Sequence, residues 1–281
     1  MWCVGRPQFD ATETYALCIS RVQNERLKRR LEDISEDIAE AAAEYAQLAG
    51  NNELHLIPQA NDVAGIVTKD EMVAIYEGRM AKMRGPARRV YDALRSLPEY
   101  GICPFCDHGV VSTLDHILPK ALFPALAVAP DNLVGSCKDC NKAKLVAAPT
   151  CAEDTTLHPY FDDISDERWL GAEVVKSDVA AIVFHIIPVA GWSYELNARI
   201  GNQFQALGLG SLYASQTARE ISGQRSDIVR IFNARGENGV RDELARKSES
   251  WEAYQLNCWQ AVTFRALSES EWYCQGGFQN H

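Results

Sequence analysis

The sequence predicts an α+β fold in which a mostly helical chain surrounds a small unit of two strands and one helix. Both halves of the chain repeat apolar residues at helical spacing. Between them, residues 103–144 carry two Cys-x-x-Cys pairs, Cys103/Cys106 and Cys137/Cys140, around short apolar segments. We expect an N-terminal helical region, a central core and a mostly helical C-terminal region, at residues 1–98, 99–150 and 151–281.

The N-terminal region contains three helical patterns. Apolar residues recur every three to five positions over 12–48 without Pro or Gly, which predicts one long helix or a broken pair. Thr68 and Glu71 form a capping-box pattern and predict a helix over 69–82. A further helix over 86–97 should end at the following proline.

The central region reads as strand, strand and helix. Residues 110–114 and 115–118 predict the two strands of a short hairpin, and the second strand should end at a proline. Three prolines make 119–136 an ordered loop. Residues 138–147 contain no helix breaker and predict a helix that begins at the second cysteine pair.

The C-terminal region shows one strand and two helices. Residues 180–188 are almost wholly apolar and predict a strand. Residues 211–232 and 250–267 predict amphipathic helices. Along the second helix, Trp251, Tyr254, Cys258, Val262 and Leu267 fall near one side, where we expect them to form core.

Four cysteines at this spacing are the ligands that a tetrahedral structural zinc ion requires. We therefore expect Zn²⁺ at Cys103, Cys106, Cys137 and Cys140. The other five cysteines are scattered, which favours buried thiols over disulfides. Taken alone, the cysteines also fit a zinc module that binds a nucleic acid or a protein without catalysis.

The charge of the chain is unevenly distributed. Its formal net charge of −10 does not favour phosphate binding by the whole molecule. Residues 79–95 nevertheless carry six basic residues, Arg88 and Arg89 among them, against one acid, whereas residues 32–44 carry six acids and no base. The basic segment fits either a nucleic-acid groove or a solvated helix surface.

No apolar run approaches the ~20 residues that a membrane span needs. The first ten residues lack the charged-then-apolar order of a signal peptide. We therefore expect a cytoplasmic protein without a membrane partner. The sequence leaves the oligomeric state open.

Oxygen ligands for a second metal lie within the same stretch. Neighbouring helix residues point about 100° apart, so Cys140 and Asn141 should face different sides of their helix. Asp115 and Asn141 together offer the hard oxygens that Mg²⁺ or Mn²⁺ prefers. We expect a catalytic divalent metal there.

A histidine and two lysines complete this candidate site. His116 follows Asp115 on a predicted strand, so the two side chains should leave opposite faces. Its imidazole titrates near neutral pH and suits a general base that activates water. Lys120 and Lys144 could contact the phosphate.

These motifs together resemble the zinc-knuckle form of the HNH endonuclease family, whose core is a ββα-metal unit. The residues that carry the resemblance are Cys103-x-x-Cys106, Leu114-Asp115-His116-Ile117-Leu118-Pro119-Lys120, Asp131-Asn132-Leu133-Val134 and Cys137-x-x-Cys140-Asn141-x-x-Lys144. The resemblance implies that His116 is the general base. It also implies that Asp115 and Asn141 bind the catalytic metal and that Asn132 braces the loop.

The resemblance further implies hydrolysis of DNA. The flanks, at 158–162 and 272–278, resemble those of stand-alone bacterial HNH proteins that occur beside an ATPase partner in anti-phage defence, Septu-like ones among them. Many family members carry a second histidine where this chain has Asn141. His158 could supply a further ligand or be a hydrogen-bonded structural histidine, and His108 could compete for zinc.

Overall fold

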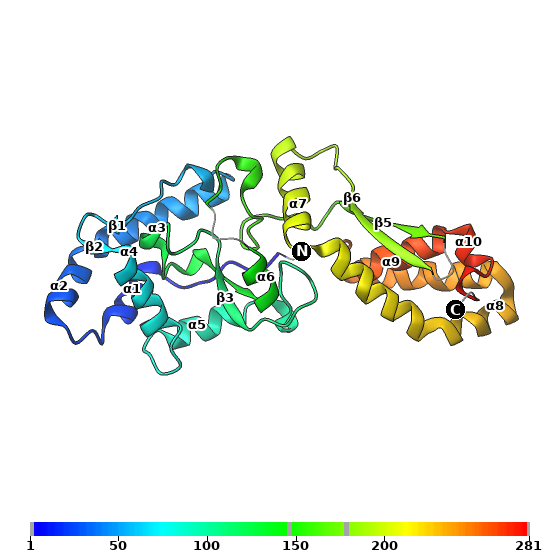
Figure 1. Ribbon diagram of the computed structural model, residues 1–281, viewed down its shortest axis with the longest axis horizontal. Helices are drawn as coiled ribbons and strands as arrows, with labels where there is room; N and C mark the ends of the chain where they lie inside the picture. Colours follow the sequence, from blue (N-terminus) through cyan, green and yellow to red (C-terminus); the bar gives the residue numbers. More distant parts are fainter. Residues whose placement is uncertain (1–2, 145–147, 177–179, 280–281) are drawn as a thin grey trace. The chain divides into compact units, whose positions relative to one another are not determined.

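The computed structural model describes residues 3–144, 148–176 and 180–279. The chain forms two compact units, residues 2–163 and 164–281, which Figure 1 draws from blue to green and from green to red. Among the described residues, no helix combines the length and the apolar composition needed to cross a bilayer.

The first unit begins with three helices where the sequence predicted one or two. They are α1 (Ala11–Ile19), α2 (Glu25–Asp33) and α3 (Ser35–Gly50). The prediction over 12–48 missed the break before α2, where the Asn24 side chain accepts a hydrogen bond from the Leu27 amide and starts a new helix. Buried residues of all three helices, including Tyr15 and Ile38, belong to the core of this unit.

A short hairpin and two further helices follow. They are β1 (Asp62–Val63), β2 (Val67–Thr68), α4 (Lys69–Ile75) and α5 (Arg88–Arg95). The capping box of Thr68 and Glu71 is present as predicted. The helix over 69–82 is shorter, because α4 passes into a π-helical turn at Tyr76–Met80.

The first unit also contains the predicted central core, formed by β3 (Thr113–His116), β4 (Leu133–Ser136) and α6 (Lys138–Ala143). The predicted hairpin of 110–114 with 115–118 is wrong, because β3 pairs antiparallel with β4 across the intervening loop. Asp115 lies opposite Val134 in this register. The C-terminal part of the predicted helix, residues 145–147, lies outside the described residues.

Helix α5 packs against this hairpin. A Cβ at Gly135 of β4 would lie 2.9 Å from Cγ of Pro98, so only glycine lets the strand approach the end of α5 this closely. Residues 151–163, which we expected to belong to the C-terminal region, lie in the first unit instead. The hydroxyl of Tyr160 ties them there by donating to the Leu133 carbonyl at 2.8 Å.

The second unit combines a two-stranded sheet with helices. Its elements are β5 (Leu170–Val175), β6 (Ala181–Ile186), α7 (Tyr194–Ala206), α8 (Leu209–Tyr254), α9 (Trp259–Glu269) and α10 (Glu271–Cys274). The predicted strand over 180–188 is present as β6, whereas β5 and α7 were not predicted. The helix over 211–232 lies within α8, which continues to Tyr254 with an interruption at Gly236.

The predicted helix over 250–267 is two elements. It is broken between α8 and α9, where the Asn257 side chain accepts hydrogen bonds from the amides of Trp169 and Leu170 at the start of β5. Cys258 then caps α9. Consequently Tyr254 is 46% exposed rather than part of the core, while Val262 is buried as expected.

Candidate metal centre and adjoining cavity

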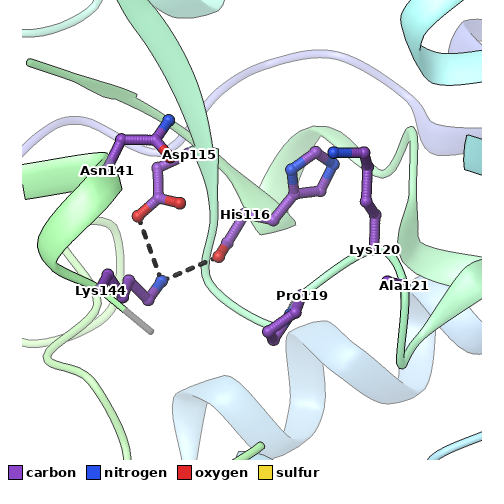
Figure 2. A pocket seen from close by; sticks show the side chains of 7 residues that line it. All are labelled: Asp115, His116, Pro119, Lys120, Ala121, Asn141 and Lys144. Atoms are coloured by element: carbon purple, nitrogen blue, oxygen red, sulfur yellow. Dashed lines mark hydrogen bonds and ion pairs between the residues drawn. The ribbon is translucent and has the colours of Figure 1, made fainter. Parts of the chain in front are cut away.

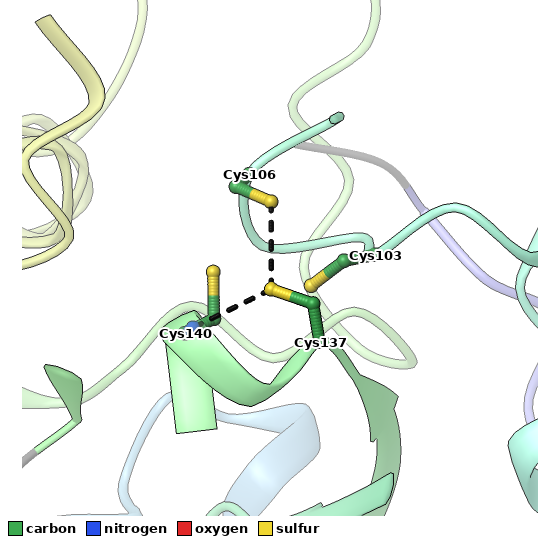
Figure 3. A group of neighbouring side chains, drawn as sticks. All are labelled: Cys103, Cys106, Cys137 and Cys140. Carbon is green, nitrogen blue, oxygen red and sulfur yellow. Dashed lines mark hydrogen bonds between the residues drawn. The ribbon is translucent and has the colours of Figure 1, made fainter. Parts of the chain in front are cut away.

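The four paired cysteines meet in one buried cluster. Their sulfur atoms all lie within 4.8 Å of one another, as the Cys-x-x-Cys spacing predicted (Figure 3). One pair comes from the turn before β3 and the other from the start of α6. Backbone amides of Gly109 and Cys140 donate to the sulfurs of Cys106 and Cys137 at 3.3 and 3.4 Å. This group could hold one metal ion.

Gly109 is required by the closeness of the cluster. A Cβ at this position would lie 2.8 Å from both Cβ and Sγ of Cys137. The first cysteine turn therefore folds directly over the second pair without intervening side-chain atoms. His108 is exposed and is not part of the cluster, so zinc competition by this histidine has no geometric support here.

A cavity of about 150 Å³ lies beside α6 and β3. The residues that line it are Asp115, His116, Pro119, Lys120, Ala121, Asn141 and Lys144 (Figure 2). Cys140 belongs to the sulfur cluster while Asn141 lines the cavity, as the helical geometry predicted. The two chemically distinct groups thus share one short helix.

Asp115 presents a carboxylate oxygen that is incompletely satisfied. Its Oδ2 atom is buried and has no hydrogen-bond partner, although the Lys144 ammonium lies 3.3 Å away. Burial raises the pKa of this carboxyl, and the charge of Lys144 offsets part of the increase. The neighbour of this oxygen is already a cation, and a carboxylate is also a hard ligand for a divalent metal, so the residues present fit such an ion in place of the ammonium.

Asn141 supplies the second oxygen. Its amide nitrogen donates to the Leu114 carbonyl at 3.3 Å. This hydrogen bond fixes the side chain against β3 and leaves the amide oxygen as the group that could bind a cation. Two oxygens from one strand and one helix are then available within the same cavity.

His116 is held in one orientation. Its Nε2 atom lies 2.9 Å from the Ala127 carbonyl, which accepts the hydrogen, so Nδ1 carries the free lone pair. The ring also contacts Tyr76 edge-on, with centroids 4.5 Å apart. Burial lowers the pKa of His116 to about 3, so the expected titration near neutral pH is wrong and the imidazole is neutral at pH 7. Figure 2 shows the imidazole and the Asp115 carboxylate leaving β3 in different directions.

The four basic residues predicted to contact nucleic acid divide into two groups. Lys120 and Lys144 line the cavity, whereas Arg88 and Arg89 do not. The Arg88 guanidinium pairs with Asp92 at 2.8 Å and stacks on a tyrosine ring of its own helix, while Arg89 is exposed.

Asn132 lies at the base of the loop between the strands. It is fully buried and its Oδ1 accepts from the Leu118 amide at 2.8 Å. Its Nδ2 donates to the carbonyls of Leu118 and Leu126 at 3.0 and 3.1 Å. Three hydrogen bonds from one side chain thereby fix both ends of the loop that carries Lys120 and Ala127.

His158 does not line the cavity. Its Nε2 atom lies 3.0 Å from the hydroxyl of Tyr45 and 3.0 Å from the Asp131 carbonyl, and the ring is surrounded by aromatic side chains. This geometry matches the expectation of a hydrogen-bonded structural histidine rather than that of a further ligand.

Two groups beside His116 were not predicted from the sequence. Tyr76 reaches the imidazole because α4 widens into a π-helical turn, and the Ala127 carbonyl reaches it because Asn132 folds the loop. The capping box fixed where α4 starts. No residue pattern in the sequence predicts the π-helical turn, because this turn depends on how the segment packs in the folded protein.

Comparisons with known proteins give one relative. No family model matches the chain, and no solved structure matches it. Protein ea31 of Escherichia phage lambda is 31% identical over 249 residues, which cover 82% of this chain and 82% of the phage protein. Similarity of this extent spans most of both chains, so this chain belongs to the same family as Protein ea31 of Escherichia phage lambda.

Proposed function

We propose that the chain is a metal-dependent endonuclease of the HNH type that hydrolyses DNA phosphodiester bonds. The observation that supports it best is the cavity, which gathers a buried carboxylate paired with a lysine, an amide oxygen and a neutral imidazole. These groups belong to Asp115, Asn141 and His116. A module that only binds nucleic acid has no need for all three in one place.

The cysteine cluster takes a structural Zn²⁺ in this proposal. Four buried sulfurs would complete the tetrahedral coordination of such an ion and leave no position for a substrate. The ion would join the turn at Cys103 to the start of α6. It would thereby keep Asn141 at its distance from β3, where Asp115 and His116 lie.

Asp115 and Asn141 would hold the catalytic Mg²⁺ or Mn²⁺. When bound, this ion supplies Lewis-acid stabilisation of the charge on the scissile phosphate and the leaving oxygen. Lys120 and Lys144 contribute further positive charge toward the phosphate oxygens. Asn132 acts indirectly, because it holds the loop that orients the histidine.

His116 is the general base in this mechanism. Its Nε2–H donates to the Ala127 carbonyl, so Nδ1 accepts a proton from the attacking water. The water oxygen bonds to phosphorus and the bond from phosphorus to the 3′ oxygen breaks. The leaving oxygen takes a proton from solvent. The products are a 5′-phosphate and a 3′-hydroxyl.

Plasmid nicking tests the mechanism. We expect the wild type to nick DNA with Mg²⁺ or Mn²⁺, and His116→Ala to cut at least ~100-fold more slowly, since a general base contributes about that much. His108→Ala is the matched control, because this histidine is exposed and lies outside the cavity. Equal cleavage by the wild type and His116→Ala would overturn the mechanism.

A non-catalytic nucleic-acid-binding module is the alternative. The exposed basic residues Lys82, Arg84 and Arg89, all in the first unit, favour it. It predicts a gel shift that weakens with salt, survives His116→Ala and is accompanied by no cleavage in any metal. Metal-dependent cutting by the wild type excludes it.

Anti-phage defence beside an ATPase partner stays a prediction that rests on the resemblance of the flanks. The structure adds the exposed acids Glu36, Glu40 and Glu44 along α3, where a basic partner could dock. A nuclease held silent by such a partner should cut little when alone. Strong unregulated cutting by the isolated chain would count against this role.

A further inference from the structure

A cation of the protein itself already lies at the candidate metal position. The ammonium of Lys144 is 3.3 Å from Oδ2 of Asp115 and donates to the carbonyl of His116 at 2.8 Å (Figure 2). Both acceptors belong to adjacent residues of β3. The side chains of Lys144 and Asp115 are only 15% and 10% exposed, so water screens this pair weakly.

An ammonium and a divalent metal need the same partners. Both bind hard oxygens, and Asp115 offers its carboxylate to either. Two positive charges held this close in a partly buried site repel each other strongly. The buried carboxylate therefore cannot hold both cations closely at once.

We propose that the Lys144 ammonium occupies the cation position at Asp115 before a divalent metal binds, and that metal entry displaces it into the cavity, where it contacts a phosphate oxygen of the substrate. This inference rests on the metal site of the proposed function.

The position of Lys144 permits this movement. The residue follows directly on α6, which ends at Ala143, and its four-carbon stem can turn without moving the helix. It already lines the cavity. Lys120 has other partners, Glu77 at 3.6 Å and the ring of Tyr76, so it does not neutralise Asp115 in place of Lys144.

Mn²⁺ titration by calorimetry on the zinc-loaded protein tests the competition. Lys144→Met keeps most of the side-chain length but removes the charge, and we expect it to bind Mn²⁺ at least ~10-fold more tightly than the wild type. Lys142→Met is the matched control, because this lysine is exposed on the same helix. Its affinity should equal that of the wild type.

Asp115→Asn separates the two proposals. If Asp115→Asn abolishes Mn²⁺ binding but Lys144→Met binds Mn²⁺ no more tightly than the wild type, the inference is overturned and the metal site stands. If Asp115→Asn binds Mn²⁺ as the wild type does, the metal site itself is overturned.

Lysine labelling tests the movement on the wild type and does not depend on the folding of a variant. We expect an amine-reactive ester to label Lys144 slowly in the metal-free protein and at least ~5-fold faster with Mn²⁺. Metal binding breaks the ion pair with Asp115 and so exposes the amine to the reagent. The rate at Lys142 should not change. An equal Lys144 rate with and without Mn²⁺ overturns the displacement.

Discussion

At the scale of single residues, Gly109 and Asn132 determine the geometry of the site without belonging to its chemistry. Gly109 leaves room for the Cys137 sulfur, and Asn132 fixes the loop through three hydrogen bonds. Neither residue offers a ligand. Each can therefore be changed to test how the site is held together.

Gly109→Ala should damage the sulfur cluster. The added methyl group would lie 2.8 Å from Cys137 Sγ, and overpacking of this kind costs about 1–3 kcal/mol. We expect a lower zinc content by atomic absorption and a lower Tm. Gly223→Ala is the control, because its Cβ would meet open space on α8 and should not destabilise the protein. Unchanged zinc content in Gly109→Ala would contradict this account.

Asn132→Ala should destabilise the first unit by about 3 kcal/mol. The substitution leaves the Leu118 amide and the carbonyls of Leu118 and Leu126 buried without this partner, and each such loss is costly. Urea unfolding measures the effect. Asn141→Ala is the comparison, because Asn141 makes one long hydrogen bond and should change stability far less while lowering DNA cleavage. Equal stability losses would show that Asn132 has no special bracing role.

At the scale of elements, α4 connects the capping box to His116, the general base of the proposed mechanism. Glu71 caps the start of the helix and forms an ion pair with Arg30 of α2. Directly after α4 ends at Ile75, the chain enters the π-helical turn, where Tyr76 contacts His116. The ion pair thus helps to position an element whose far end supports the site.

Glu71→Gln should lower the stability of the protein by about 1 kcal/mol at pH 7, since the pair is partly exposed. The hydrogen bond from Arg30 lowers the pKa of Glu71 below its ordinary value of 4.5. Its stabilising effect is therefore complete above about pH 4.5 and is lost as the pH falls through the lowered pKa. Urea unfolding at pH 7 and pH 3 should show a difference between wild type and variant that shrinks in acid. Glu40→Gln, on the exposed face of α3, should show no such difference.

At the scale of the whole molecule, the four-cysteine cluster belongs to only one of the two compact units. All four cysteines fall within residues 2–163. The second unit has its own core around α8 and α9 and carries two buried cysteines, Cys258 and Cys274, outside the cluster. Loss of metal should therefore act on the first unit.

Chelation of zinc should loosen the first unit selectively. Structural zinc contributes on the order of 10 kcal/mol to small domains. By hydrogen exchange, we expect peptides within 103–144 to lose protection after chelation or in Cys137→Ser, while peptides of α9 keep it. Cys3→Ser is the control, because Cys3 is exposed and outside the cluster. Uniform loss of protection in both units would contradict the division.

The sequence alone determined the sulfur cluster, the capping box and the different sides of the helix on which Cys140 and Asn141 lie. These features depend on residues only a few positions apart in the sequence, so the local geometry of a turn or helix fixes them. It also predicted that Asp115, His116 and Lys144 share one site. This prediction came from the family resemblance, which implies which residues come together in the fold, whereas sequence spacing alone does not.

Only the tertiary structure decided which strand pairs with β3, and hence the shape of the cavity. Residues 115–118 and 133–136 are both short segments with two apolar residues each, and local propensity does not choose between them. The choice follows from long-range contacts, namely the loop held by Asn132 and the close approach of Gly135 to Pro98. The same contacts bring Tyr76 and the Ala127 carbonyl to His116, and a pairing between distant segments leaves no periodic trace in the sequence.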